Sequence, residues 1–175
     1  MKKDRLVLGG GCFWCIEAVY NDTKGVLNAV SGYTGGLRPN PSYQNVCTGA
    51  TGHAEIVDIS YDSEIITLKE LLDIFFVIHD PTTLNAQGAD RGTQYRSVVY
   101  YDNEEEKKII LDAIEMQQEN FSEKIVTEVS QLGDVFAAED YHQNYYKLNE
   151  NQGYCQVVIA PKIQKFMTNF PDKLA

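Results

Sequence analysis

The chain has 175 residues, and its 25 Asp and Glu residues against 15 Lys and Arg residues give it a net charge of −10. This acidic balance argues against binding to nucleic acid or to an anionic membrane surface, because both need clustered positive charge. The hydrophobic content of 43% is typical of a folded globular protein, and the length suits a single domain that spans residues 1–175.

No stretch of the sequence is typical of a leader peptide or of a membrane-spanning segment. The first apolar stretch covers only Leu6–Leu8, whereas a secretory leader needs about 7–15 apolar residues. The apolar run Ile74–Ile78 is far shorter than the ~18 residues that cross a bilayer. We therefore expect a cytoplasmic protein, in which the cysteines are reduced at rest. They are Cys12, Cys15, Cys47 and Cys155.

The first third of the chain predicts two strands with a helix between them. Arg5–Leu8 has the pattern of a short buried strand, and Gly9–Gly11 ends it. Cys12–Tyr20 carries apolar residues at helical spacing, and Val26–Val30 again has the pattern of a strand. Gly32–Gly52 shows no period and is rich in Gly and Pro, which indicates a long irregular segment of the kind that often carries function.

The middle of the chain predicts another strand followed by a helix. Ile56–Tyr61 alternates apolar and polar residues, as a strand buried on one face does. Thr67 and Glu70 have the spacing of a capping box at the start of an apolar helix, and Asp80–Pro81 ends that helix. We expect a second irregular segment at Thr82–Gln94.

The last part of the chain predicts shorter elements. Ser97–Tyr101 has the pattern of a strand, and Asp102–Glu105 has the pattern that caps a long helix. Ile125–Val129 and Gln156–Ala160 are predicted as further strands, and Lys162–Phe170 as a short helix. Strands and helices alternate irregularly along the chain, which favours an α+β domain or a mixed α/β sandwich over a doubly wound parallel sheet.

The segment Gly10–Cys15 is the strongest sign of chemistry in the sequence. Its glycines let the chain turn sharply after a strand, so that Cys12 falls at the N-terminus of the following helix. Free backbone N–H groups and the helix dipole favour a thiolate there, and the two aromatic residues that follow can form an apolar wall. The pattern predicts a nucleophilic cysteine, although a cysteine packed as a small apolar residue in a Gly-rich turn remains the simpler alternative.

The same segment contains the spacing C-x-x-C. Cys12 and Cys15 could form a redox-active dithiol pair or half of a zinc site. The zinc interpretation is weak, because Cys47 and Cys155 are isolated and no histidine lies at ligand spacing to a cysteine or to another histidine. We expect no bound metal.

The residues Gly11–Trp14 resemble the nucleophile motif of the type A methionine sulfoxide reductases. Further segments resemble the same family in the same order, over roughly residues 4–162. These segments are Gly32–Gly36, Tyr43–Cys47, Thr51–Glu55, Asp90–Ser97, Ala138–Gln143 and Gly153–Cys155. Agreement of this many ordered segments by chance is very improbable.

The resemblance implies a two-layer α+β sandwich with a mixed sheet, a ferredoxin-like plan and long irregular loops. It also implies a site that binds methionine sulfoxide, whose reduction needs a nucleophile for sulfur, an apolar pocket for the methyl group and donors for the oxygen. The residues of this chain that match are Cys12 as nucleophile, Phe13 and Trp14 as the methyl pocket, Tyr43, Glu55 and Tyr95 as donors to the oxygen, and Asp90 as a support of the site.

The reaction that the resemblance implies is thiol-dependent reduction of methionine S-sulfoxide, free or in proteins, as a repair of oxidative damage. Attack by Cys12 would release methionine and leave a sulfenic acid, which a second cysteine converts to an intramolecular disulfide. Thioredoxin or a similar thiol would then reduce the disulfide. No cofactor is implied, and we expect a monomer. Glu55 must be protonated to donate, so burial should raise its pKa.

Two residues could supply the second thiol. Cys155 is preferred because it follows Asn149–Gly153, a polar stretch that we expect to be mobile. Cys15 is the alternative, and it would share a helical turn with Cys12, where disulfide geometry is strained. Cys47 is expected to be a buried thiol.

Other interpretations of the sequence remain open. A general dithiol–disulfide oxidoreductase would use Cys12 and Cys15 and would need neither Glu55 nor a tyrosine donor. A binding module without catalysis would be indifferent to the loss of Cys12. We expect His53 and His142 to have structural roles rather than to act as catalytic bases.

Overall fold

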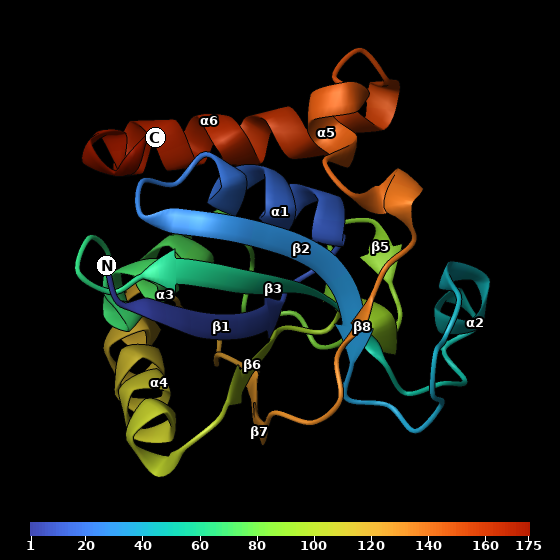
Figure 1. Ribbon diagram of the computed structural model, residues 1–175, viewed down its shortest axis with the longest axis horizontal. Coiled ribbons are helices and arrows are strands. Elements are labelled where there is room, and N and C mark those ends of the chain that lie inside the picture. The colour runs from blue at the N-terminus through green and yellow to red at the C-terminus, as the bar shows by residue number, and fades with distance from the viewer.

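The computed structural model describes residues 1–175, which form a six-stranded mixed sheet with helices packed on it (Figure 1). The spatial order of the strands is β7-β6-β1-β3-β2-β8, and β4 pairs with β5 in a separate small sheet. The strands are β1 Lys3–Gly9, β2 Val26–Thr34, β3 Ala54–Asp62, β4 Ala86–Gln87, β5 Asp90–Arg91, β6 Val98–Tyr101, β7 Glu128–Gln131 and β8 Phe136–Ala137.

Six α-helices connect or cover these strands, and a π-helical turn at Cys155–Ile159 leads directly into the last of them. The helices are α1 Phe13–Asn21, α2 Tyr43–Cys47, α3 Leu68–Ile78, α4 Glu104–Gln117, α5 Tyr145–Leu148 and α6 Ala160–Asn169.

The order of elements confirms the predicted ferredoxin-like plan. The chain runs β1-α1-β2-β3-α3-β6, and these four strands lie in the order β6-β1-β3-β2 with every neighbouring pair antiparallel. At one end of the sheet β7 pairs in parallel with β6, and at the other end β8 pairs antiparallel with β2, which makes the sheet mixed. The first turn of α1 and the beginning of β3 lie at the same end of the sheet, near β5 (Figure 1).

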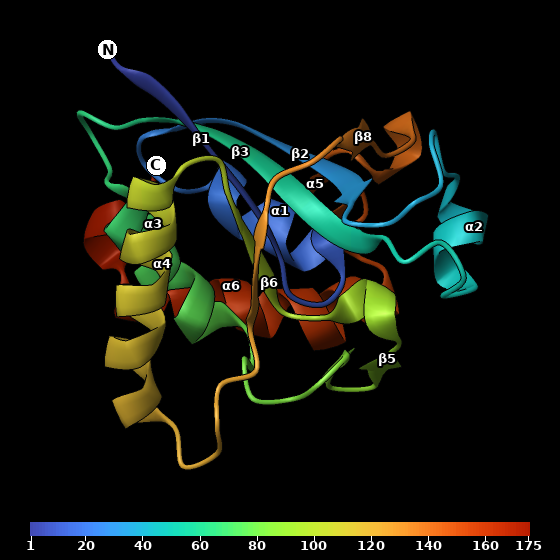
Figure 2. The same cartoon turned by 90° about the horizontal axis from the view of Figure 1, so that it is seen from below.

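The two faces of the sheet are covered differently. One face packs against α1, α3 and α6, which all lie on one side of it (Figure 2). This face includes Val57 and Ile59, as the alternating pattern of β3 predicts. On the opposite face Ile56 belongs to a smaller apolar cluster that the segment around Leu132 and Val135 covers. The domain is therefore the predicted two-layer sandwich with one main core.

The helix caps agree with the sequence in one case and differ by one residue in another. Thr67 and Glu70 form the predicted capping box at the start of α3. The cap of α4 is Asn103 rather than Asp102, because the side chain of Asn103 accepts the backbone N–H of Glu106. Asp102 lies outside the helix.

The predicted strand at Gln156–Ala160 is wrong, since these residues belong to the π-helical turn and α6. Cys155 and Ile159 are both buried while Val157 is 74% exposed, so the apolar run concealed a helical spacing. The irregular segment Gly32–Gly52 is also shorter than predicted, because β2 continues to Thr34 and α2 forms within the segment.

The carboxylate of Glu17 fastens α1 to its surroundings. Glu17 is buried on α1 and accepts hydrogen bonds from the hydroxyl of Ser31 on β2 and from the backbone N–H of Asn144. These hydrogen bonds hold the segment around Asn144 beside α1, the helix that begins directly after Cys12. A buried carboxylate with these partners is a structural anchor rather than a reactive group.

Replacing Glu17 with alanine should lower the free energy of unfolding by about 1–3 kcal/mol, because it leaves the buried Ser31 hydroxyl without an acceptor and removes the hydrogen bond to the Asn144 N–H. Chemical denaturation measures this change. Glu115→Ala is the matched control, since Glu115 is an exposed glutamate on α4, and it should cost less than about 0.5 kcal/mol. Equal losses in the two variants would contradict the anchor role.

Candidate active site

The glycines after β1 let the chain pass close to β3 and turn into α1. A side chain at Gly9 would place its Cβ 2.4 Å from the backbone oxygen of Glu55, so only glycine fits between the two strands. Gly11 has a φ of +93°, in the left-handed region that favours glycine. This turn positions Cys12 immediately before α1, as the sequence predicts.

Cys12 is the N-cap residue of α1 and has an extended backbone, with φ −63° and ψ 127°. Its side chain does not cap the helix. Instead the carboxylate of Glu55 accepts the backbone N–H of Phe13 at 3.2 Å, which brings this acid to the same helix end. Cys12 is 8% exposed, so its sulfur is shielded yet lines a cavity that reaches the surface.

The predicted stabilisation of a Cys12 thiolate by the helix end does not prevail in the resting site. Burial raises the pKa of Cys12 well above that of a free thiol, and the hydrogen bond that Cys12 donates to Cys15 and the charge of Glu55 raise it further. A backbone N–H at the helix start opposes this shift without overcoming it. The pKa of Cys15 is lowered, chiefly because its sulfur accepts that hydrogen bond.

Glu55 has the burial that a protonated donor requires. It is 1% exposed at the beginning of β3, and burial raises its pKa to about 8. Its Oε1 atom accepts the Phe13 N–H, whereas its Oε2 atom is buried without any hydrogen-bond partner. At neutral pH the carboxylic acid is therefore mostly neutral and has an unused donor.

Two tyrosines near Glu55 also keep their protons. Tyr43 is the first residue of α2, and Tyr95 is the last residue of the 3₁₀ turn Thr93–Tyr95. The backbone oxygen of Tyr95 accepts the N–H of Gly11 at 3.1 Å. Burial and the charge of Glu55 raise the pKa of both hydroxyls. The structure thus brings the predicted donors Tyr43, Glu55 and Tyr95 to the neighbourhood of Cys12.

Aromatic side chains surround the two residues after the nucleophile. The ring of Phe13 lies 5.7 Å from that of Tyr33 and 6.4 Å from that of Tyr43, between ring centroids. The indole of Trp14 stacks on the ring of Tyr145 at 3.6 Å. Phe13 and Trp14 are therefore held in an apolar cluster, as expected for a wall that contacts a methyl group.

The role of His142 was only partly foreseen. The indole N–H of Trp14 donates to Nδ1 of His142 at 3.0 Å, which places the imidazole proton on Nε2. Burial lowers the pKa of His142, so the ring stays neutral. Trp14 and His142 are separated by 128 positions in sequence, and no local pattern could have indicated their contact. His53 has the structural role that we expected, with hydrogen bonds to Gly36 and Arg38.

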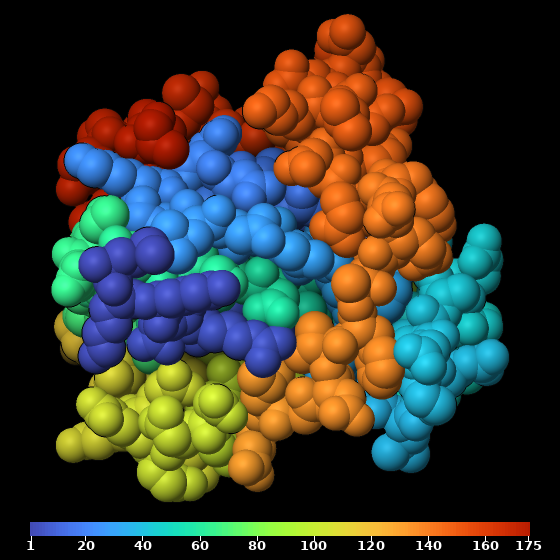
Figure 3. Space-filling view, in the orientation of Figure 1, coloured from blue at the N-terminus to red at the C-terminus, as the bar shows by residue number.

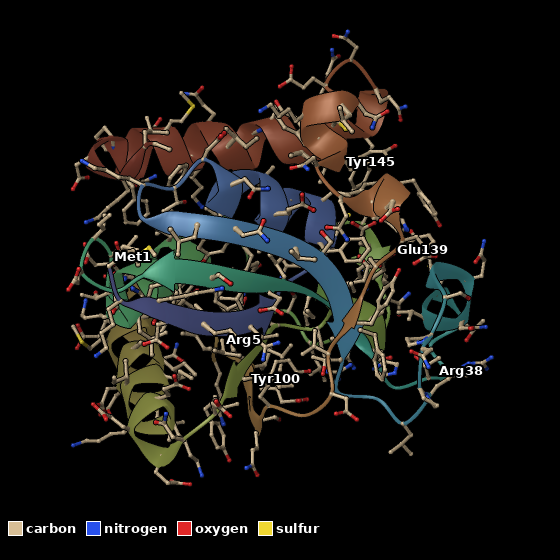
Figure 4. All side chains as sticks on the ribbon, viewed as in Figure 1. Met1, Arg5, Arg38, Tyr100, Glu139 and Tyr145 are labelled. Atoms are coloured by element: carbon tan, nitrogen blue, oxygen red, sulfur yellow. The ribbon has the colours of Figure 1, made fainter.

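Glu139 joins the α2 segment to the rest of the site. Its carboxylate accepts the hydroxyl of Tyr33 at 2.9 Å and the backbone N–H of Tyr43 at 3.0 Å. In Figure 4 Glu139 lies between β8 and α2. The space-filling view shows the α2 segment projecting at the edge of the molecule beside the segment that follows β8 (Figure 3). Glu139 is a positioning residue that sequence reasoning missed.

The side chain of Asp90 accepts a hydrogen bond from a tyrosine in the C-terminal part of the chain. The hydroxyl of Tyr154 donates to Asp90 at 2.7 Å, and the ring of Tyr154 contacts Trp14 edge to face. This hydrogen bond closes the segment before Cys155 over the nucleophile region. Asp90 therefore holds the ring of Tyr154 against Trp14.

The remaining cysteines differ in exposure. Cys15 and Cys155 are buried in the same apolar core as Cys12, whereas Cys47 is exposed. The expectation that Cys47 is buried is wrong, because the short helix α2 buries only Val46 against the core. All four cysteines are free thiols in this structure.

No group of three or more His, Cys, Asp or Glu side chains has the arrangement of a metal site. No helix is long and apolar enough to cross a membrane. The groups that the structure gathers beside Cys12 are a second thiol, a neutral carboxylic acid, tyrosine hydroxyls and aromatic rings. These groups define a thiol-dependent oxidoreductase whose substrate has both a polar oxygen and a small apolar group.

Comparison with known proteins identifies the family. The family model described as peptide methionine sulfoxide reductase matches residues 4–174. The peptide methionine sulfoxide reductase MsrA of Polynucleobacter asymbioticus is 52% identical over 98% of this chain and 92% of its own length. The chain belongs to the peptide methionine sulfoxide reductase family, and it reduces methionine sulfoxide.

Solved structures agree with this assignment. The reduced form of Mxr1 from Saccharomyces cerevisiae has a TM-score of 0.82 and 37% identity, covering 88% of this chain and 90% of that chain. The same yeast protein in complex with Trx2 has a TM-score of 0.58 and 27% identity, covering 82% of this chain and 85% of that chain. The predicted fold class is confirmed by these likenesses.

Proposed function

We propose that Cys12 attacks the sulfur of methionine S-sulfoxide while Glu55 donates a proton to its oxygen. The observation that carries this assignment is the unpartnered Oε2 atom of Glu55, buried on an acid whose pKa is about 8 and whose other oxygen binds the helix that begins beside Cys12. A buried polar atom without a partner is costly, and a substrate oxygen would satisfy it.

The other residues complete the binding of the sulfoxide group. The hydroxyls of Tyr43 and Tyr95 donate to the oxygen, and their raised pKa keeps them protonated over the physiological range. Phe13 and Trp14 contact the methyl group through their apolar rings. Asp90 keeps Tyr154 against Trp14, which preserves this wall.

The chemical step transfers oxygen and two electrons. The sulfoxide sulfur is reduced as its bond to oxygen breaks, and the sulfur of Cys12 is oxidised as it gains that oxygen as a hydroxyl. Methionine leaves, and Cys12 remains as a sulfenic acid. A neutral Glu55 also helps the attack, because its carboxylate charge would otherwise raise the pKa of Cys12.

The geometry supports Cys15 as the thiol that first condenses with the sulfenic acid. Its sulfur already contacts that of Cys12, and Cys12 lies outside the helical turn because it is an extended N-cap residue. Condensation releases one water molecule and forms the Cys12–Cys15 disulfide. Cys155 remains the other candidate, and it is fully buried in a π-helical turn that would have to open.

Mapping of the disulfide distinguishes the two thiols. After one turnover without reductant, Cys155→Ser should retain a disulfide that joins Cys12 to Cys15, and Cys15→Ser should accumulate sulfenic acid. Peptide mass spectrometry with a sulfenic-acid probe measures both species. A disulfide from Cys12 to Cys155 in the wild type would reverse the assignment and restore the preference drawn from the sequence.

We propose a thioredoxin as the protein that reduces the disulfide, with the monomeric enzyme acting in the cytoplasm. Support comes from the related yeast protein Mxr1, which has been solved in complex with Trx2.

Single-turnover chemistry tests the proposed function. The reduced enzyme without added thiol should release about one methionine per molecule from the S-sulfoxide and much less from the R-sulfoxide, because a chiral site places only one epimer with its oxygen at Glu55 and its methyl group at Trp14. Chromatography of the amino-acid products measures both. Equal release from the two epimers would contradict this site geometry. Reduction of an unrelated disulfide that is unaffected in Glu55→Gln would favour the dithiol oxidoreductase instead.

A further inference from the structure

A cavity of about 560 Å³ is lined by α6, by the segment after α3 and by the two neighbouring thiols. We call it the α6 cavity. Its lining includes Cys12, Cys15, Asp80, Tyr154, Lys162 and Lys165. Among the residues assigned to sulfoxide binding, Glu55, Tyr43, Tyr95, Phe13 and Trp14 do not line it. The cavity shares Cys12, Asp90 and Tyr154 with the proposed sulfoxide site, and it also exposes the thiol pair to lysines of α6 that the sulfoxide chemistry does not use.

The charges of the α6 cavity are arranged in two groups. Lys162 and Lys165 lie three positions apart on α6, and neither forms an ion pair. Asp80, Asp90 and Glu123 contribute carboxylates, and that of Asp90 accepts the hydroxyl of Tyr154. Two ammonium groups without ion pairs and three carboxylates in one small cavity are complementary to a ligand that carries carboxylate and ammonium groups of its own.

Size and chemistry limit what can occupy the cavity. A volume of about 560 Å³ is in the range of small-molecule sites and is too small for a folded protein domain. The reactive groups at its base are sulfur atoms that become a disulfide during turnover under the proposed function. The ligand that can react there is a thiol, which exchanges with a disulfide.

We propose that the α6 cavity binds a small zwitterionic thiol, held by Lys162 and Lys165, and that this thiol reduces the disulfide formed by Cys12. The proposal rests on the proposed function only for the existence of that disulfide. The bound thiolate attacks the sulfur of Cys12, forming a mixed disulfide and releasing the thiolate of Cys15. A second thiol molecule then attacks the bound thiol, so that two thiols become one disulfide and the enzyme regains both its thiols.

Lys162 has a further effect that favours this direction of exchange. After the hydrogen bond from Cys12, and against the opposing effect of burial, the positive charge of Lys162 lowers the pKa of Cys15. A thiol with a lower pKa leaves more readily in disulfide exchange. The same ammonium group can therefore attract the carboxylate of the incoming thiol and stabilise the departing sulfur.

The first stage of the test prepares the oxidised enzyme and separates the two proposals. Enzyme without thiol is mixed with methionine S-sulfoxide, and the methionine released is counted before the substrate is removed. If no methionine is released at this stage, the proposed function is refuted independently of the cavity, which is probed only in the later stages. Reduction is then followed by the fluorescence of Trp14, which is the single tryptophan and lies beside the thiol pair.

The second stage compares three thiols in the wild type. Glutathione, which carries two carboxylates and one ammonium group, should reduce the enzyme with a saturable rate that falls as salt concentration rises. Its diethyl ester should need about 10-fold higher concentration for half-saturation, since it lacks the carboxylates that pair with the lysines. Dithiothreitol, which is uncharged, should show no saturation and little salt dependence.

The third stage uses Lys162→Met and Lys165→Met, with Lys108→Met on α4 as a control of equal charge change outside the cavity. Each cavity variant should raise the half-saturating glutathione concentration about 10-fold and leave methionine release unchanged. The control should match the wild type. The proposal is overturned if the ester and glutathione behave alike, or if all three variants show the same dependence on glutathione.

Discussion

Replacing Cys12 with serine is expected to abolish turnover of methionine S-sulfoxide, with a loss of at least about 10³-fold in rate. A serine hydroxyl keeps nearly the same volume at the start of α1, but it ionises far less readily than a thiol and cannot form a sulfenic acid or a disulfide. The aromatic wall and Glu55 remain in place, so substrate should still bind. Methionine release over a single turnover measures the loss.

The control for this experiment is Cys47→Ser. Cys47 is the exposed cysteine of the four; its sulfur forms a hydrogen bond with the hydroxyl of Tyr43, and a serine oxygen at this position can keep that contact. Its replacement should change the rate by less than about 2-fold. Substantial turnover by Cys12→Ser would contradict the assignment of Cys12 as the nucleophile.

Replacing Glu55 with glutamine is expected to lower the rate of methionine release by about 10²–10³-fold. Glutamine has a similar shape and its amide can donate a hydrogen bond to the sulfoxide oxygen, but it cannot transfer a proton. The N–H of Phe13 keeps an acceptor in the amide oxygen of the variant, so the start of α1 should remain intact. Single-turnover rates at neutral pH give the effect.

The pH dependence provides a sharper measurement for the same residue. The folded-state pKa of Glu55 is raised to about 8, so the donor is protonated below that pH and loses its proton as pH rises through it. The wild-type rate should therefore decline on the alkaline side with an apparent pKa near 8. This decline should be absent in Glu55→Gln. If the variant shows the same alkaline decline, another group must supply the proton.

The site combines two groups whose needs conflict. Burial raises the pKa of Cys12, which disfavours the nucleophilic thiolate, and it also raises the pKa of Glu55, which provides the proton donor. The conflict is reduced because a neutral Glu55 places no negative charge beside the sulfur. The raised pKa of Cys12 is therefore a consequence of the same environment that activates Glu55.

The elements of the ferredoxin-like plan, β1-α1-β2-β3-α3-β6, and the position of Cys12 directly before α1 could be inferred from sequence. The alternation in β3 and the capping box at Thr67 are local patterns, since strand period and helix caps depend on neighbouring residues. The glycines before Cys12 likewise indicate a strand that turns into a helix. The donors and the methyl pocket were predicted through resemblance to a family. Without the resemblance, a glutamate just before a strand, such as Glu55, is more often a solvated carboxylate than a buried donor.

Only the tertiary structure decided the environment of each reactive group. The burial of Glu55 and the contact between Trp14 and His142 depend on segments that are far apart in the chain. The contact of Cys15 with Cys12 depends on where α1 begins, which is one residue later than the sequence predicts. Desolvation and long-range hydrogen bonds set the pKa values, and they leave no local trace in sequence. The α6 cavity has the same origin, since α6 reaches the thiols through packing against α1 and α3.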